Sequence, residues 1–161
     1  NSLLIEKELR IVQITEKLIV ERLNEIKTFY NNISNEFSTI FNWTEESDSY
    51  FLNPLDQKFK YSFLIENVET SKICFMQFSS IYKNEILHLH FTHGLKEYRG
   101  QGLAKIIQLR LYNEAALNNI KRIEAYWPKY NNVSIILFLK MGWNIEEIRK
   151  ENTQLYMQAD I

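Results

Sequence analysis

The stretch that decides how this sequence is interpreted is Tyr98-Arg99-Gly100-Gln101-Gly102-Leu103-Ala104. The chain has 161 residues but only 4 glycines, whereas average usage would give about 11. Two of the four lie in this stretch, and Gly94 shortly precedes it. Glycine is kept where the backbone bends unusually or approaches another group closely. A chain that concentrates its few glycines in one place therefore indicates a specialised turn there.

The glycine stretch has the features of a phosphate-binding turn. A predicted strand from Glu85 to about Thr92 precedes it, and a predicted helix begins at Leu103. The first backbone N–H groups of a helix have no intrahelical acceptor, and the helix dipole makes them attractive to anions. Gly100 and Gly102 remove side chains that would keep a pyrophosphate away, while Arg99 and Lys105 add positive charge. The alternative is a tight strand-to-helix turn that happens to contain two glycines. Neither of the two familiar glycine-rich phosphate motifs fits: G-x-x-x-x-G-K-[ST] is absent, and G-x-G-x-x-G lacks its last glycine because position 105 is Lys.

Hydrophobic periodicity on both sides of this turn predicts a mixed α/β (α+β) domain, with helices packed on a largely antiparallel sheet. The predicted strands are 9–14, 59–65, 73–81, 85–92, 123–127, 143–148 and 153–159, and the predicted helices are 15–30, 34–41, 103–118 and 133–141. Thr15 is the expected N-cap of the first helix. The stretch 42–58 is expected to be a long surface loop and a candidate lid over a ligand. Helix 133–141 is apolar almost all round, which predicts burial.

Composition and charge narrow the function classes. A length of 161 residues with 45% hydrophobic and 24% charged residues is typical of one soluble domain, which we expect to span 1–161. The net charge of -1 lacks the electrostatic footprint of a nucleic-acid or membrane binder. No apolar run approaches the length of a membrane span, and the first residues lack the apolar core of a signal peptide. With Cys74 as the only cysteine, an internal disulfide is excluded. We expect a cytoplasmic protein.

Two motifs in this order resemble a known family. The run from Arg99 to Ala104 matches the R/Q-x-x-G-x-G/A motif of the GNAT superfamily, the acyl-CoA-dependent N-acyltransferases. The residues just before it, Thr92 to Tyr98, resemble those that precede the motif in one bacterial branch of the family. The family's second signature, N-x-x-A-x-x-L-Y-x-K-x-G-F, is similar to Asn131-x-x-Ser134-x-x-Leu137-Phe138-x-Lys140-x-Gly142-Trp143, and the spacing agrees at every listed position. The resemblance in sequence covers Glu85 to Gln158, and before that it rests on the predicted order of elements.

The resemblance implies a GNAT-like fold, in which about four helices flank a mostly antiparallel sheet of six to seven strands. It also implies acetyl-CoA as the co-substrate, with its pyrophosphate on the backbone amides of the glycine stretch and its pantetheine arm along the strand that ends at Gly94. The residues implied in this site are Gly94, Leu95, Arg99, Gly100, Gln101, Gly102, Leu103, Ala104, Lys105, Asn131 and Phe138. Asn131 would lie near the pantetheine arm, and the alternative for it is a plain helix N-cap.

The proton chemistry of acyl transfer points to two histidines. An attacking amine must be neutral, so a base is useful, and the family often keeps its base on the strand where His88 and His90 stand. Two residues apart, they are expected to share one face, with Leu87, Leu89 and Phe91 on the other. The alternatives are that they are half-buried polar residues, or that they bind a metal ion together with His93 and Glu97. No metal is expected.

The sequence does not identify the general acid of the reaction or the amine that accepts the acyl group. Where the family commonly has a tyrosine as general acid, this chain has Phe138, which cannot donate a proton. Tyr126, Tyr130 or water is then the acid, or the thiolate leaves unaided. The expected reaction is direct attack by a primary amine of a small molecule or peptide on the acyl-CoA in a ternary complex. The alternative is an acyl-CoA-binding module without catalysis. A homodimer is one of the states that the family adopts, and the sequence leaves the oligomeric state open.

Overall fold

A computed structural model describes residues 2–41, 43–82, 85–151 and 153–161. In this part of the chain the strands form one seven-stranded sheet in the order β1-β2-β3-β4-β5-β7-β6. Neighbouring strands are antiparallel except β4 and β5, which are parallel. The strands are β1 Leu9–Gln13, β2 Phe63–Asn67, β3 Ile73–Tyr82, β4 Ile86–Gly94, β5 Arg122–Pro128, β6 Asn144–Arg149 and β7 Gln154–Asp160. The mixed α/β plan with a mostly antiparallel sheet is confirmed.

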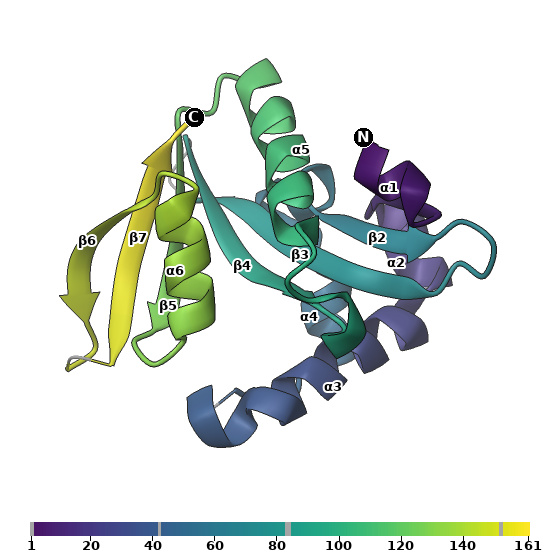
Figure 1. Cartoon of the computed structure of the whole chain (residues 1–161), viewed down its shortest axis with the longest axis horizontal. Helices are drawn as coiled ribbons and strands as arrows, with labels where there is room; N and C mark the ends of the chain where they lie inside the picture. The colour runs from purple at the N-terminus through teal and green to yellow at the C-terminus, as the bar shows by residue number, and fades with distance from the viewer. Residues whose placement is uncertain (1, 42, 83–84, 152) are drawn as a thin grey trace.

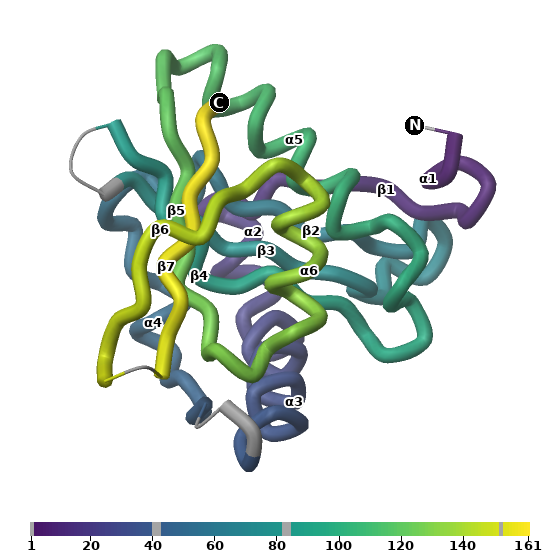
Figure 2. Tube along the Cα trace, turned by 60° about the vertical axis from the view of Figure 1, so that its left-hand side comes forward, coloured from purple at the N-terminus to yellow at the C-terminus, as the bar shows by residue number. Residues whose placement is uncertain are grey.

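Helices cover both faces of the sheet (Figures 1 and 2). They are α1 Ser2–Glu6, α2 Glu16–Glu21, α3 Leu23–Phe41, α4 Asp48–Leu52, α5 Leu103–Leu117 and α6 Asn132–Lys140, with short 3₁₀ segments η1 Leu55–Lys60 and η2 Lys96–Tyr98. One core lies beneath α5 and includes Phe63 and Ile65 of β2, and the other lies beneath α2, α3 and α4 and includes Leu64. The alternation of side chains along β2 thus supplies both cores.

The parallel pairing between β4 and β5 is short. It joins Ile86–His88 to Arg122–Glu124, and beyond that point the two strands diverge (Figure 1). On its other edge β4 stays paired with β3 through a bulge at His90, because Phe78 pairs with Phe91 while Ser79 pairs with Leu89.

The bulge changes which way β4 side chains point. Leu87 and Leu89 lie in the α5-side core, but Phe91 lies in the core beneath α3 and α4. The expectation that all three share one face is therefore wrong, because an extra residue in a bulge resets the alternation of a strand.

Several predicted elements differ in extent. The predicted helices 15–30 and 34–41 are instead a short α2 and a 19-residue α3, with the break at Arg22, although Thr15 caps α2 as expected through a 3.1 Å bond from Leu18 N. The stretch 42–58 is not a plain surface loop, because α4 and η1 lie in it and bury Phe51. Strand β2 begins at Phe63 rather than position 59, since η1 runs to Lys60. No pattern in the sequence predicted α1.

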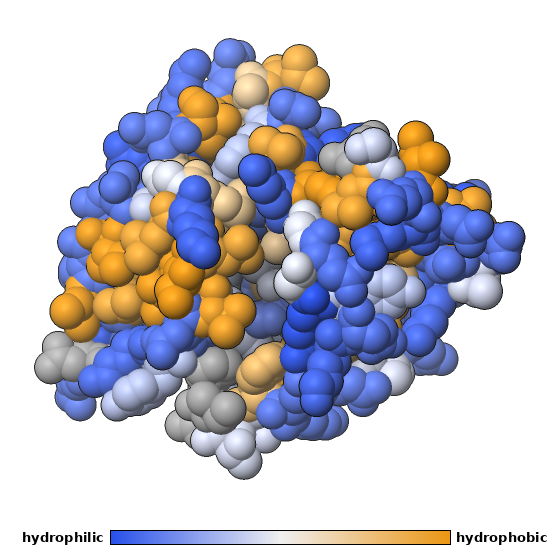
Figure 3. Space-filling view, viewed as in Figure 1, coloured by the Kyte–Doolittle hydropathy of each residue, from blue (hydrophilic) through white to orange (hydrophobic). Residues whose placement is uncertain are grey.

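Helix α6 is only half buried, which corrects the expectation of full burial. Val133 is 82% exposed, Ile136 51% and Leu139 43%. These residues form an outer stripe on a helix whose other side packs on the sheet, and Figure 3 shows the apolar surface over α6. Among the described residues, no helix is long and apolar enough to cross a membrane.

A buried carboxylate fixes α2 and α3 on the sheet. The Glu66 side chain in β2 is 4% exposed and accepts hydrogen bonds from Arg10 at 3.1 Å and from Arg22 at 2.8 Å. Arg22 lies at the α2–α3 junction and also donates to the Ser71 carbonyl at 2.7 Å. Because a buried carboxylate without its cations is costly, this network holds the start of α3 against the β2–β3 hairpin.

We expect Glu66→Gln to lower the free energy of unfolding by about 3 kcal/mol, because it removes one partner of a buried ion-pair network. Urea denaturation measures this change. Glu21→Gln is the matched control, since the Glu21–Lys17 pair is 3.8 Å apart and both side chains are mostly exposed. That control is expected to cost less than about 0.5 kcal/mol. Equal losses in the two variants would contradict the anchoring role.

Candidate functional site

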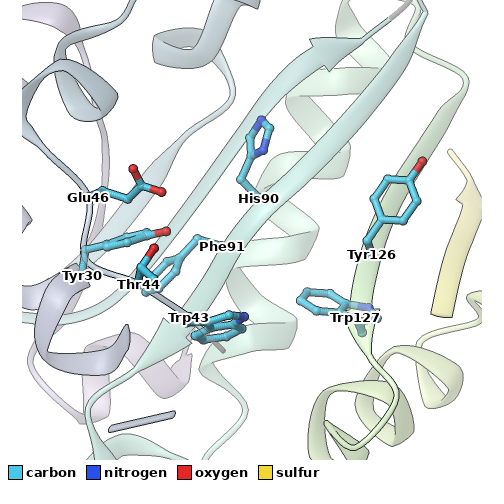
Figure 4. A pocket seen from close by; sticks show the side chains of 8 residues that line it. All are labelled: Tyr30, Trp43, Thr44, Glu46, His90, Phe91, Tyr126 and Trp127. Carbon is cyan, nitrogen blue, oxygen red and sulfur yellow. The ribbon is translucent and has the colours of Figure 1, made fainter. Parts of the chain in front are cut away.

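A cavity of about 230 Å³ lies where β4 and β5 separate. Four parts of the chain line it: α3, the segment that follows α3, β4 and β5. The lining residues, labelled in Figure 4, are Tyr30, Trp43, Thr44, Glu46, His90, Phe91, Tyr126 and Trp127. Figure 3 shows the hollow between the surface over α6 and the surface over the loop before α5. The site is thus assembled from segments that are distant in sequence.

Helix α3 holds the segment after it in place through Asn31. The buried Asn31 side chain accepts a 3.0 Å hydrogen bond from the Glu46 backbone N–H. Tyr30 packs its ring against Phe91 at 4.5 Å and against Phe51 at 5.3 Å. The wall opposite β4 is therefore fixed by core packing and by a buried amide.

The two histidines of β4 are adjacent but have different partners. Their ring centroids are 4.6 Å apart. His88 Nδ1 lies 3.2 Å from a carboxylate oxygen of Glu124, and the other oxygen of Glu124 accepts a 2.6 Å hydrogen bond from Tyr156. Glu124 is 4% exposed. A carboxylate only accepts hydrogen bonds, so His88 carries its proton on Nδ1 and presents Nε2 as an acceptor.

His90 is held in the neutral state. Its Nε2 lies 2.5 Å from the Ser80 hydroxyl oxygen. Close packing of protein around the ring, followed by electrostatic interactions with His88 and Lys58, lowers the pKa of His90 well below its ordinary value of 6.5. Solvent still reaches part of the ring. His90 therefore faces the cavity as an uncharged hydrogen-bonding group at neutral pH.

Sequence analysis missed Glu124 and Tyr156. A charged residue between Ile123 and Ala125 in an apolar strand is the only local signal. Its partner lies on the neighbouring strand, because β5 pairs with β4 on one side and with β7 on the other. Only the sheet order brings His88, Glu124 and Tyr156 together.

The glycine stretch adopts the conformation expected of an open turn. Gly100 has φ +71° and Gly102 has φ +86°, with Gly102 at the N-cap of α5. The bond from Ile106 N to Gly102 O is 3.2 Å, so the three preceding amides of α5 have no acceptor within the helix. A Cβ on Gly100 would meet no atom within 4 Å in the part of the chain that the structure describes. The backbone here is open to an anion.

Arg99 lies beside this turn with its charge already engaged. Its guanidinium forms two hydrogen bonds with Glu36 of α3, at 2.6 and 2.7 Å, and a third at 3.0 Å with the Gly94 carbonyl. This pairing lowers the pKa of Glu36. The phosphate contact expected of Arg99 stays a prediction, and in this structure Arg99 joins α3 to the turn. Lys105 is exposed in the first turn of α5.

Two residues of the second motif, Asn131 and Phe138, lie in different surroundings. Asn131 is the N-cap of α6, where its side-chain oxygen accepts from Ser134 N at 3.3 Å. Its amide nitrogen is buried and has no partner in the described ranges. Phe138 is fully buried between Trp127 and Trp143, with ring centroids 5.1 and 4.7 Å away. Asn131 thus has a free donor, whereas Phe138 is a packing residue here.

Gly94 and Leu95 mark the end of β4. A Cβ on Gly94 would lie 2.7 Å from the Phe75 ring, so only glycine allows this approach to β3. Leu95 N donates to the Cys74 carbonyl at 2.9 Å. Both residues are thereby held to β3, on the edge of β4 that faces away from β5.

His93 does not join the other two histidines. Its ring packs against Phe37 at 5.7 Å and against Trp43 at 5.1 Å. Over the described ranges, no group of three His, Cys, Asp or Glu side chains is arranged to hold a metal ion.

Comparisons with known proteins agree with this architecture. No family model matches the sequence, and no curated protein matches it. Among solved structures, a GNAT-family acetyltransferase from Staphylococcus aureus has a TM-score of 0.76 at 13% identity, over 94% of this chain and 98% of that one. A second GNAT-family acetyltransferase, from Streptococcus pneumoniae, has a TM-score of 0.71 at 22% identity, over 96% of this chain and 99% of that one. The acetyltransferase yncA of Salmonella typhimurium, solved with acetyl-CoA, has a TM-score of 0.74 at 14% identity, over 95% and 94%.

Burial of His93 predicts a loss of stability in acid. Its Nε2 has no hydrogen-bond partner among the residues described, and burial lowers the pKa of His93 to about 3. An unfolded histidine binds its proton near pH 6.5, so between pH 6.5 and 3 the unfolded state binds more protons. We expect the free energy of unfolding to fall in this window by up to about 1.4 kcal/mol per pH unit.

Urea denaturation from pH 7.5 to 4.5, on wild type and His93→Phe, measures this dependence. The variant keeps a ring against Phe37 and Trp43, and its stability should fall less steeply below pH 6.5. Parallel curves for the two proteins would show that His93 does not contribute.

Proposed function

Because the chain has the fold of the GNAT acetyltransferases, we propose that it transfers an acyl group, acetyl in the first instance, from an acyl-CoA to a primary amine. The observation that carries this proposal is the open glycine turn at the start of α5, in a sheet whose strands β4 and β5 stop pairing after His88 and Glu124. The turn offers backbone amides to a pyrophosphate, and the cavity lined by His90 and Tyr126 lies where β4 and β5 separate.

Three features of the chain fit a coenzyme A thioester. The amides at the start of α5 would hold the pyrophosphate, with space over Gly100 where a side chain would otherwise stand. The β5-facing edge of β4 has no strand partner beyond His88 in the described part of the sheet, so it would accept the pantetheine arm as an added strand. The buried amide nitrogen of Asn131 would donate to a carbonyl of that arm. When bound, the coenzyme supplies the activated acyl group.

We assign the proton acceptor to His88 rather than His90. Glu124 fixes the His88 proton on Nδ1 and would stabilise the imidazolium after protonation. His90 is a weaker base because its pKa is lowered, but as a neutral ring on the cavity wall it would orient the amine. The amine nitrogen bonds to the thioester carbon, the carbon–sulfur bond breaks, and the amine proton passes to His88, directly or through water.

Phe138 favours one alternative, an acyl-CoA-binding module without turnover. It occupies the place of the family's usual acid, and its ring is sealed between two tryptophans. A thiolate with an ordinary pKa of about 8.5 leaves without an acid at a modest cost, so Phe138 slows transfer without abolishing it. Release of free CoA thiol in the presence of amines separates the two functions. A small-molecule or peptide amine remains the proposed partner, in a cytoplasmic protein.

Replacing Gly100 by Asn tests the pyrophosphate site. Asn tolerates positive φ better than other side chains, so the fold should persist while the side chain covers the amides. We expect affinity for CoA to fall at least tenfold, measured by calorimetry. Gly142→Asn is the matched control, since Gly142 has φ +90° and also has open space around its would-be Cβ. Equal CoA affinity in the two variants would place the pyrophosphate elsewhere.

Replacing each histidine tests the proton path. We expect His88→Gln and Glu124→Gln to lower kcat at least tenfold and to change the acid limb of the pH–rate profile. His90→Gln should raise KM for the amine and leave that limb in place, because His90 stays neutral across it. All three should keep wild-type CoA affinity. A His90→Gln variant that alone removes the acid limb would reverse the two roles.

A further inference from the structure

The acceptor cavity contains a carboxylate whose charge the proposed chemistry does not use. Glu46 lines the cavity on the wall formed by α3 and the segment after it, and in Figure 4 its carboxylate points toward the open space in front of His90. Among the described residues, the side chain of Glu46 forms no hydrogen bond or ion pair. Its backbone, by contrast, is fixed by the Asn31 side chain, which accepts a 3.0 Å hydrogen bond from the Glu46 N–H and donates a 3.4 Å hydrogen bond to the Glu46 carbonyl. The Glu46 charge acts electrostatically on Lys58, but without a direct contact its carboxylate oxygens can still bind a group from outside the chain.

The surroundings of Glu46 suit a cation. Tyr30 and Trp43 line the same wall and present aromatic rings, which attract ammonium groups electrostatically. Lys58 interacts electrostatically with Glu46, but its ammonium donates to the Tyr50 carbonyl and lies 4.2 Å from the Tyr50 ring centroid. Burial lowers the pKa of Lys58 to about 8. It is 6% exposed and does not line the cavity.

The group held by Glu46 cannot be the reacting amine. A carboxylate in contact with an ammonium raises the pKa of that ammonium, whereas the nitrogen that attacks the thioester must be neutral. The reacting nitrogen therefore belongs at the other wall, near His90 and the gap between β4 and β5. A volume of about 230 Å³ leaves room for a short chain between the two positions.

We propose that the acceptor is a short aliphatic diamine, or an amine with an equivalent second cationic group, and that Glu46 is the residue that selects it. Glu46, with the rings of Tyr30 and Trp43, holds the distal ammonium, and the proximal amine lies at His90. This assignment rests on the proposed acyl transfer and adds the substrate class to it.

The test compares 1,4-diaminobutane with n-butylamine, which has the same chain and lacks the second ammonium. For wild type we expect kcat/KM with acetyl-CoA to favour the diamine at least tenfold. In Glu46→Gln that ratio should fall to about one. Glu45→Gln is the matched control, because Glu45 is the exposed neighbour that pairs with Asn35 at 2.8 Å, and it should keep the wild-type ratio.

Three outcomes would overturn the assignment: equal kcat/KM for the two amines in wild type, a diamine preference that survives in Glu46→Gln, or a loss of equal size for both amines. If no amine gives turnover, the transferase proposal fails, and calorimetry of the two amines with wild type and Glu46→Gln still decides on the cation site. Diamine binding that disappears in Glu46→Gln supports it, and equal binding of the diamine to both proteins refutes it.

Discussion

The separation of β4 from β5 after a few parallel pairs is the constraint on which the rest of the structure depends. Parallel pairing ends at His88 and Glu124, so the backbone groups of β4 beyond that point are not used by β5. The bulge at His90 lets β4 stay paired with β3 while its side chains change face. The gap in the sheet and the bulge thus fall at the same part of β4, and after the bulge Phe91 lies in the core that supports the opposite wall.

The far wall of the cavity depends on interactions well away from it. Glu66 and Arg22 fix the start of α3 on the sheet, and farther along the helix Asn31 fixes the backbone of Glu46. Glu36, one turn later, binds Arg99 beside the glycine turn. A single helix therefore contacts both the cavity wall and the turn, so a change in its position would alter both.

The sequence predicted the regular elements where periodicity was strong and local. The strand order could be expected only through the two motifs, which also indicated the turn at Gly100 and Gly102. The bulge at His90 was not predictable, because it depends on the register with Ser79 and Phe78. Glu124 was missed for a related reason, since its role arises from two different strand neighbours. The burial of α6 was overestimated because an apolar sequence does not say how many sides of a helix find a partner.

In the proposed reaction, the site would separate two electrostatic tasks that would conflict at one position. Holding a cation requires a fixed negative charge, which Glu46 provides on one wall, whereas releasing a neutral amine requires that no such charge touches the reacting nitrogen. His90 meets this second condition because the protein packed around its ring and the electrostatic effects of His88 and Lys58 lower its pKa. Glu124 is buried and contacts His88 and Tyr156, so in the proposed reaction its charge would act on the histidine and not on the amine. Two carboxylates in one site can thus differ in function because only one of them faces the cavity.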